Sequence, residues 1–520
     1  MSKLTDKIAA KILGHDSTHE VPNKEMLKYA AGIIGQNNAV SLIASWFQYF
    51  CISVLYMNPL ILGTVLSISR VWDAVNDPIV GSIIDKHTFK NGEKLRPWLK
   101  LTPIPMGILL VILFTDFHLP QTYQLVFIAV FYFLFDFLYS FQDIAQWGMT
   151  AMMATSSKER ERISQLGRFA ATVGTWLPGL IPVLIPIAVG LAPDFGVSEN
   201  TMEKNIFFIF AVVFGFGGML LSRMGHAARE RAPAKKVEGN VLAGLKLIFK
   251  NKIVMLLVLS SVLEQCTLVL DQIYFFKYMV SFNILGMEID GMTSSFIFGL
   301  LVGLPGTFTM LLAVKFSRKV GGMKNVIVIA VVATIVCRML AYAVGFSGLS
   351  IVFTGILLAI ASIPTSMKGI ATTALWCDSL DYIELKHGQR NDGSVFAMQN
   401  FVSKIGGAIK TFLVGVTFTI LAFSAKAADA GEPMSDAFAQ YSWPIFILGP
   451  VFGSMLALIP LLFLKHSKKQ QMQIEEELKL KRLVRQIFVT DIYSRPGIRL
   501  GAGSHSPALV EARQKNSKCK

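Results

Sequence analysis

Two aspartates and an asparagine stand in the middle of an apolar stretch, residues 60–86, that is long enough to span a lipid bilayer. Asp73 and Asp77 are four residues apart and Asn76 lies between them, so in a helix all three share one face. A charge at the bilayer centre costs about 2.5 to 3.5 kcal/mol, and such residues usually face a water-filled ion or proton pathway. The pattern therefore predicts a cation site. The alternative is a buried pair that a basic residue on another helix neutralises.

Transmembrane helices are the elements that must position this cluster. The 520-residue chain is 53% hydrophobic and only 16% charged, which is the composition of a polytopic membrane protein. A helix needs about 20 apolar residues to cross the hydrocarbon core, and we count about twelve candidates, which predicts an all-α integral membrane fold. They are residues 28–56, 60–86, 98–115, 121–148, 166–192, 205–224, 253–282, 293–317, 325–345, 349–376, 394–424 and 443–465.

Lys and Arg gather after alternate helices, whereas the intervening loops 193–204 and 425–442 are acidic. Basic loops mark the cytoplasmic side, so both termini are expected to be cytoplasmic. This asymmetry explains most of the net charge of +15, and no nucleic acid partner is expected. The N-terminus lacks the short apolar core and cleavage site of a signal peptide, so no removal of a leader is expected.

A long basic stretch near the middle of the chain divides it into two similar halves. The predicted organisation is an N-terminal cytoplasmic segment (1–27), a six-helix bundle (28–224), a cytoplasmic central loop (225–252), a second six-helix bundle (253–465) and a basic cytoplasmic tail (466–520). Repeated halves are typical of secondary transporters, whose substrate site lies between the halves near the bilayer midplane.

Enzyme and metal motifs are missing from the sequence. The five cysteines lack metal-ligand spacing, and there is no G-x-S-x-G elbow, P-loop or HExxH motif. We therefore expect neither an enzyme nor a cofactor. Without a nucleotide site, an ion gradient is the expected source of energy.

Four sequence blocks occur in the order and spacing of a known family. They are RVWDAVNDPIVGSIIDKHTFKNGEKLRPW (from residue 70), DIAQWGMTAMMATSSKERERISQLGRF (from 143), DSLDYIELKHGQR (from 378) and QNFVSKIGGA (from 399). They resemble the glycoside-pentoside-hexuronide:cation symporters, the melibiose permease group of the major facilitator superfamily. The resemblance covers roughly residues 25–465. It implies twelve helices in two pseudo-symmetric bundles, in the inner membrane of a bacterium.

The resemblance also implies a site. The family's Na⁺, Li⁺ or proton site falls on Asp73 and Asp77, with Asn76 and Ser140 as further oxygen donors. Its substrate-binding positions fall on Asn37, Asp143, Trp147, Arg168 and Lys404. Lys404 matches the family's membrane-embedded lysine and can offset the charges of Asp73 and Asp77. The alternative for the substrate wall is that Trp147 is an interfacial anchor and that Asp143 merely pairs with Arg168.

Charged residues in the loops after the second and tenth predicted helices are expected to form cytoplasmic gate ion pairs that break when the conformation changes. They are Asp85, Arg96, Asp378, Asp381, Glu384 and Arg390. Each is semi-exposed, so one pair contributes about 1 kcal/mol or less.

The substrate is left open by the sequence. Sugar-transporting relatives carry an acidic residue where this chain has Asn37, and an amide cannot offer a charged acceptor to a hydroxyl. With Arg168, Lys368 and Lys404 available, an anionic sugar is an option. Glu264 and Asp271 are seven residues apart and are expected to share a face that lines the cavity, with a second ion site or a solvated helix end as the alternatives. The predicted function is Na⁺- or H⁺-coupled symport of a sugar or glycoside-like solute by a monomer in contact with lipid. A symporter of lysolipids or another non-sugar solute is the alternative.

Overall fold

The computed structural model describes residues 20–231, 251–280, 282–284, 287–387 and 392–464, together with Gln473, Glu476 and Glu477. In this part of the chain the regular structure is helical apart from one short antiparallel hairpin of β1 (Phe282–Ile284) and β2 (Met287–Ile289). The predicted all-α class is therefore confirmed, and the hairpin was not predicted. The predictions for most of the central loop and for the tail lie outside the described residues.

Every predicted span of the first half coincides with a helix or an interrupted run of helices. These are α2 (Asn23–Tyr49) with the π-helical turn η2 (Phe50–Val54), α3 (Pro59–Lys86), α4 (Trp98–Leu101) with α5 (Pro103–Leu113), α6 (Gln121–Met152), α7 (Ser157–Trp176) with η3 (Pro178–Leu180) and α8 (Ile181–Gly190), and α9 (Glu199–Phe210) with η4 (Ala211–Phe216), α10 (Gly217–Ser222) and η5 (Arg223–Ala227).

The second half repeats this arrangement. Its helices are α12 (Lys252–Gln265), α13 (Gln272–Met279), α14 (Gly291–Thr309) with η6 (Met310–Leu312) and α15 (Ala313–Val320), α16 (Met323–Val344), α17 (Ser350–His387), α18 (Asp392–Ile420), α19 (Ala425–Asp429) and α20 (Asp436–Phe463). Eight helical runs among the described residues are long and apolar enough to cross a membrane. The predicted spans 28–56, 60–86, 98–115 and 253–282 are not among those eight. α3 carries charged residues in its middle, and α5 and α12 are short.

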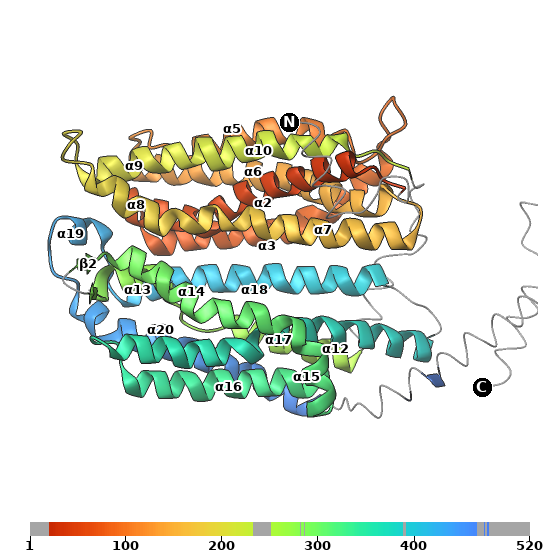
Figure 1. Cartoon of the computed structure of the whole chain (residues 1–520). Coiled ribbons are helices and arrows are strands. Elements are labelled where there is room, and N and C mark those ends of the chain that lie inside the picture. Colours follow the sequence, from red (N-terminus) through yellow and green to blue (C-terminus); the bar gives the residue numbers. More distant parts are fainter. Residues whose placement is uncertain are drawn as a thin grey trace, which may run out of the picture.

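The two halves form two bundles that lie side by side (Figure 1). They meet along two seams, where α3 packs on α18 and α8 packs on α14. One apolar core, rich in Phe, Tyr and Trp, runs through both bundles near α19, for example from Phe207 of α9 to Phe275 of α13. The cores toward the other end are each confined to one bundle. Among the described residues, the bundles are thus joined by continuous apolar packing at the α19 end.

Two features of the local sequence position the helices that carry the site. One is the cap that begins α3, and the other is a glycine that lets α2 pack closely on α10. Asn58 caps α3 by accepting hydrogen bonds from the amides of Leu60 (3.0 Å) and Ile61 (3.2 Å), and Pro59 supplies the first helical residue. Gly35 of α2 packs directly on α10, because a Cβ there would lie 2.3 Å from the carbonyl oxygen of Gly218. This close approach fixes α2 within the N-terminal bundle.

Candidate functional site

The predicted cation-site residues come together where α3 crosses α6. Ser140 of α6 donates a hydrogen bond to Asp77 Oδ1 (2.9 Å) and lies 3.5 Å from Asp73 Oδ1. Asn76 Nδ2 donates to Ser140 Oγ (2.9 Å). Asp73, Asn76 and Ser140 are buried and Asp77 is half-buried. The i, i+4 spacing of the two aspartates therefore produces the shared face that the sequence predicts.

Lys404 reaches this cluster from the other bundle. Its Nζ lies 2.9 Å from Asp73 Oδ2 and contacts Asp77 Oδ2, and it also donates to the backbone carbonyl of Asp73 (3.3 Å). One ammonium therefore bridges both carboxylates across the α3–α18 seam. The predicted offset of charge takes the form of a direct contact, so Lys404 faces the predicted cation site.

The donor set of this cluster fits a hard cation such as Na⁺. Two carboxylates and the Ser140 hydroxyl supply oxygen atoms, and Asn76 Oδ1 is buried without a hydrogen-bond partner among the described residues. Hard cations prefer such oxygen ligands. Because the ammonium of Lys404 already contacts both carboxylates, an entering cation has to compete with it.

A third carboxylate, Asp136, lies on α6 one turn before Ser140. Ser69 of α3 donates a hydrogen bond to Asp136 Oδ2 (2.5 Å), and the Asp136 side chain is buried. The sequence marks Asp136 as an unusual charge in a helix. Its position against α3, beside the predicted site, results from the crossing of α3 and α6.

The predicted substrate wall is only partly assembled as expected. Asp143 accepts hydrogen bonds from Gln36 Nε2 (2.9 Å) and from the Tyr139 hydroxyl (3.2 Å). Asn37 turns back onto its own helix and donates to the carbonyl of Ile33 (2.9 Å). Gln36 rather than Asn37 is therefore the α2 residue that contacts the Asp143 carboxylate. The sequence does not predict this contact, because neighbouring polar residues on a helix give no signal of which one faces α6.

Arg168 and Trp147 lie where α7 passes α6. Arg168 is exposed, and no ion pair between it and Asp143 occurs among the described residues. Trp147 packs toward Gly167, the residue before Arg168. The alternative in which Asp143 merely pairs with Arg168 is therefore not the arrangement that the structure has. Trp147 is half-buried, so neither side chain is enclosed in the core of the bundle.

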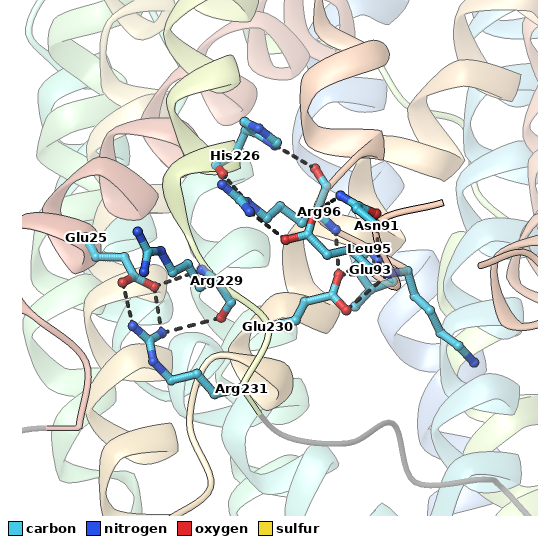
Figure 2. Close-up of polar contacts among 10 residues, drawn as sticks. Glu25, Asn91, Glu93, Leu95, Arg96, His226, Arg229, Glu230 and Arg231 are labelled. Carbon is cyan, nitrogen blue, oxygen red and sulfur yellow. Dashed lines mark hydrogen bonds and ion pairs between the residues drawn. The ribbon is translucent and has the colours of Figure 1, made fainter. Parts of the chain in front are cut away.

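The loop after α3 is held by the chain that follows α10 (Figure 2). The Glu230 carboxylate accepts hydrogen bonds from three consecutive amides, those of Lys94 (3.1 Å), Leu95 (2.7 Å) and Arg96 (2.9 Å). Glu25 receives two hydrogen bonds from the Arg231 guanidinium (2.6 and 2.7 Å) and raises the pKa of that group. Carboxylates thus connect the ends of α2, α3 and α10.

Arg96, a predicted gate residue, belongs to this cluster. It forms an ion pair with Glu93 (2.5 Å) and donates from Nε to the carbonyl of His226 (2.7 Å), so its contacts lie within the N-terminal bundle. Asp85 is exposed, and its carbonyl accepts from Lys94 Nζ (3.2 Å). Asp378 is half-buried on α17. The side chains of Asp381 and Glu384, and Arg390, lie outside the described residues, so their part in a gate stays a prediction.

The predicted span 253–282 is interrupted in its middle. α12 ends at Gln265 and α13 begins at Gln272. Thr417 Oγ1 accepts from the amide of Val269 (3.2 Å), and α20 approaches so closely that a Cβ at Gly449 would lie 2.2 Å from the carbonyl oxygen of Leu268. The expectation that Glu264 and Asp271 share one helical face is therefore wrong, because no continuous helix joins them.

A second charged contact between the bundles lies at the α19 end. Lys277 of α13 donates to the hydroxyl of Tyr49 on α2 (2.9 Å) and lies 3.5 Å from Glu203 Oε1 on α9. Nearby, the Tyr56 hydroxyl donates to Asp429 of α19 (2.9 Å). These polar contacts reinforce the apolar core that joins the bundles here.

Replacing Lys277 by Ala is expected to let the α19 end open more often, because the ion pair and the Tyr49 hydrogen bond are both lost. Cys51 is fully buried in the core at this end, so its rate of maleimide labelling, followed on its own peptide by mass spectrometry, reports the opening. We expect a rise of about fivefold, which corresponds to about 1 kcal/mol.

Lys204→Ala is the matched control, because Lys204 pairs with Asp116 (2.9 Å) within the N-terminal bundle. An equal labelling rate in Lys277→Ala and in the unchanged protein would contradict a closing role for this contact.

Comparisons with known proteins agree with this architecture. The sequence profile of a family described as MFS/sugar transport protein matches residues 28–468. The lactose permease of Lactobacillus delbrueckii subsp. bulgaricus is 27% identical over 410 residues, which cover 75% of this chain and 62% of that protein. The match thus spans less than two thirds of that permease. The isoprimeverose transporter of Lactiplantibacillus pentosus is 25% identical over 455 residues, which cover 86% of this chain and 90% of that protein.

A solved structure shares the fold. The crystal structure of a D-xylose-proton symporter superposes with a TM-score of 0.56 at 15% identity, covering 85% of this chain and 98% of that one. At this identity the likeness shows the fold alone, which is the arrangement of helices in two bundles.

Proposed function

This chain belongs to the MFS/sugar transport protein family, within the glycoside-pentoside-hexuronide:cation symporter group that its sequence blocks resemble, and we propose on this basis that it carries out Na⁺- or H⁺-coupled symport of a sugar or glycoside-like solute. The observation that carries the proposal is the contact of Lys404 with Asp73 and Asp77 across the seam between the bundles. A transporter, rather than an enzyme, is what the family membership implies.

Coupling follows from competition at the two carboxylates. With Lys404 bound to them, the α3–α18 seam is held together by charge. A cation that binds Asp73, Asp77, Ser140 and Asn76 Oδ1 releases the ammonium and so changes the contact between the bundles. Na⁺ and a proton both meet this requirement, since each neutralises carboxylate charge. Coupling is reciprocal, so a sugar that tightens cation binding is itself bound more tightly by the same factor.

The sugar is proposed to bind next to this site on α6 and α7. Asp143, oriented by Gln36 and Tyr139, accepts hydrogen bonds from hydroxyls. Trp147 offers an aromatic face to the ring, and Arg168 donates. Asn37 contributes less to sugar binding than predicted, because its side chain donates to the carbonyl of Ile33 on its own helix. Because α3 and α6 share the Ser140–Asp77 hydrogen bond, cation binding and the sugar wall are connected through one helix pair.

Alternating access supplies the movement. The α19 end is closed by the shared apolar core and by the contacts of Lys277. Basic residues mark the opposite end as cytoplasmic, so we propose that this conformation is closed toward the outside. Rocking of one bundle against the other would then break the α19-end contacts and open the site outward.

A lysolipid is the second candidate substrate, and one observation favours it. An apolar groove of about 790 Å³ is lined by residues of α3, α18 and α20 and by Cys266–Leu268. Exposed Val71, Phe412 and Phe452 place it on the outer surface, where an acyl chain can enter. However, no charged side chain lines this groove, so it offers no charged partner for a lysolipid headgroup. The sugar therefore remains the first candidate.

Thermal stability of the purified protein tests the proposal. We expect lactose, isoprimeverose, D-xylose or D-glucuronate to raise the melting temperature, and to raise it further when sodium is added or the pH is lowered, because a ligand that binds only the folded state stabilises it. Stabilisation by lysophosphatidylcholine alone would support the second candidate. No response to any of the four sugars under either condition would contradict the sugar assignment.

A further inference from the structure

An ion pair between Glu264 and Lys368 lies inside the C-terminal bundle. Lys368 Nζ contacts Glu264 Oε1, which joins the last turn of α12 to α17. Both side chains are partly exposed, Glu264 by 32% and Lys368 by 19%. Charged groups at membrane depth usually face a water-filled interior, and the partial exposure of both side chains agrees with such a placement.

The contacts of neighbouring residues support an inward direction. Cys266, which follows the last residue of α12, lines the apolar groove on the outer surface. Glu264 does not line that groove and contacts Lys368 instead, so its side chain points toward α17. Between them, Gln265 packs against Gly406 of α18, two residues after Lys404. The Glu264–Lys368 pair therefore lies at nearly the same depth as the cation site, on the other side of α18.

The bundles contact each other along two seams. α3 meets α18 and α8 meets α14, while the residues of the proposed sugar wall come from α2, α6 and α7. A solute held by Asp143 and Arg168 still needs partners on the opposite wall. Glu264 and Lys368 are charged side chains of the C-terminal bundle that are partly exposed at that level.

The chemistry of the pair suits two neighbouring hydroxyl groups. A carboxylate accepts a hydrogen bond from one hydroxyl, and the adjacent ammonium donates to the other, each as a charge-assisted hydrogen bond. In the absence of a solute the two groups neutralise one another, so neither is left as a lone charge in the membrane. Their exposure allows them to exchange this contact for a ligand.

We propose that Glu264 and Lys368 form the C-terminal half of the sugar site and bind two neighbouring hydroxyls of the solute. This inference rests on the proposed function. It means that the solute bridges both bundles, so the C-terminal bundle selects among sugars by the position of their hydroxyls.

Binding measurements on Glu264→Gln and Lys368→Met test this role. The probes are lactose, isoprimeverose, D-xylose and D-glucuronate, titrated by calorimetry with sodium present, and sodium titrated without sugar. We expect affinity for the sugar that the unchanged protein binds to fall about 10- to 100-fold in each variant, because a charge-assisted hydrogen bond is lost. Sodium affinity without sugar should stay within about twofold, since neither residue touches the cation cluster.

The controls are Glu199→Gln and Lys319→Met, which remove exposed charges elsewhere and should leave sugar affinity unchanged. If either test variant fails to fold, Glu264→Asp and Lys368→Arg keep the charges, and are expected to change the order of preference among the four sugars. Unchanged sugar affinity and preference with a lower melting temperature would overturn the inference and leave the pair a structural one. Failure of the unchanged protein to bind any of the four sugars would instead overturn the proposed function.

Discussion

Asp73→Asn and Asp77→Asn are each expected to abolish cation-driven accumulation of the solute while leaving expression intact. Each change removes one of the two carboxylates that Lys404 and Ser140 contact. An amide neither attracts a cation as strongly nor carries a proton, so the imposed gradient no longer drives transport. Because Asn matches Asp in volume, the helix packing should be preserved. Uptake into membrane vesicles under an imposed sodium or proton gradient measures the effect.

Asp194→Asn makes the same chemical change in an exposed loop and should transport like the unchanged protein. We expect exchange of labelled solute at equal concentrations on both sides to survive in the Asp73 and Asp77 variants, since exchange needs no net coupling. Full response to the gradient in both variants would show that the coupling site lies elsewhere.

Lys404→Ala is expected to have the second largest effect, on coupling and on stability together. It leaves Asp73 and Asp77 facing each other without their shared ammonium. Exposed ion pairs contribute about 1 kcal/mol, whereas breaking a buried pair costs about 3 to 5 kcal/mol. Lys404 is partly exposed, so the loss of unfolding free energy should lie between these values. Coupled uptake should be lost, because the competition that links cation binding to the α3–α18 seam is gone.

A double variant separates the two roles of Lys404. Lys404→Ala combined with Asp77→Asn removes the surplus negative charge, so we expect melting temperature to recover in part while coupled uptake stays absent. Lys410→Ala, which removes an exposed lysine from the same helix, is the control. Unchanged dependence of uptake on the cation in Lys404→Ala would mean that the lysine is structural.

Helices and the cation cluster are largely determined by the sequence. Long apolar runs are helical in a bilayer, because internal hydrogen bonds must satisfy their backbone. Each predicted span contains helical structure, although the span 253–282 is interrupted. Asp73 and Asp77 share a face because four residues make about one turn. A local periodicity therefore sufficed to find them.

Contacts between distant segments cannot be predicted from local periodicity. Nothing in the spacing of residues 36 and 37 shows that Gln36 reaches Asp143 while Asn37 folds back onto Ile33. The apolar stretch between Gln265 and Gln272 resembles a continuous helix, and its interruption depends on Thr417 and on the close approach of α20 at Gly449. These features depend on which helices pack together, and at what depth.

The sequence by itself determined that this is a multi-pass membrane protein with carboxylates stacked on one transmembrane helix, because composition and helical periodicity are local properties. Only the tertiary structure decided that Lys404 bridges those carboxylates, that the bundles are joined at the α19 end, and that Glu264 faces Lys368 rather than sharing a face with Asp271. The physical reason is that each of these contacts joins residues far apart in the chain, whose distance is set by helix crossing and not by helical pitch.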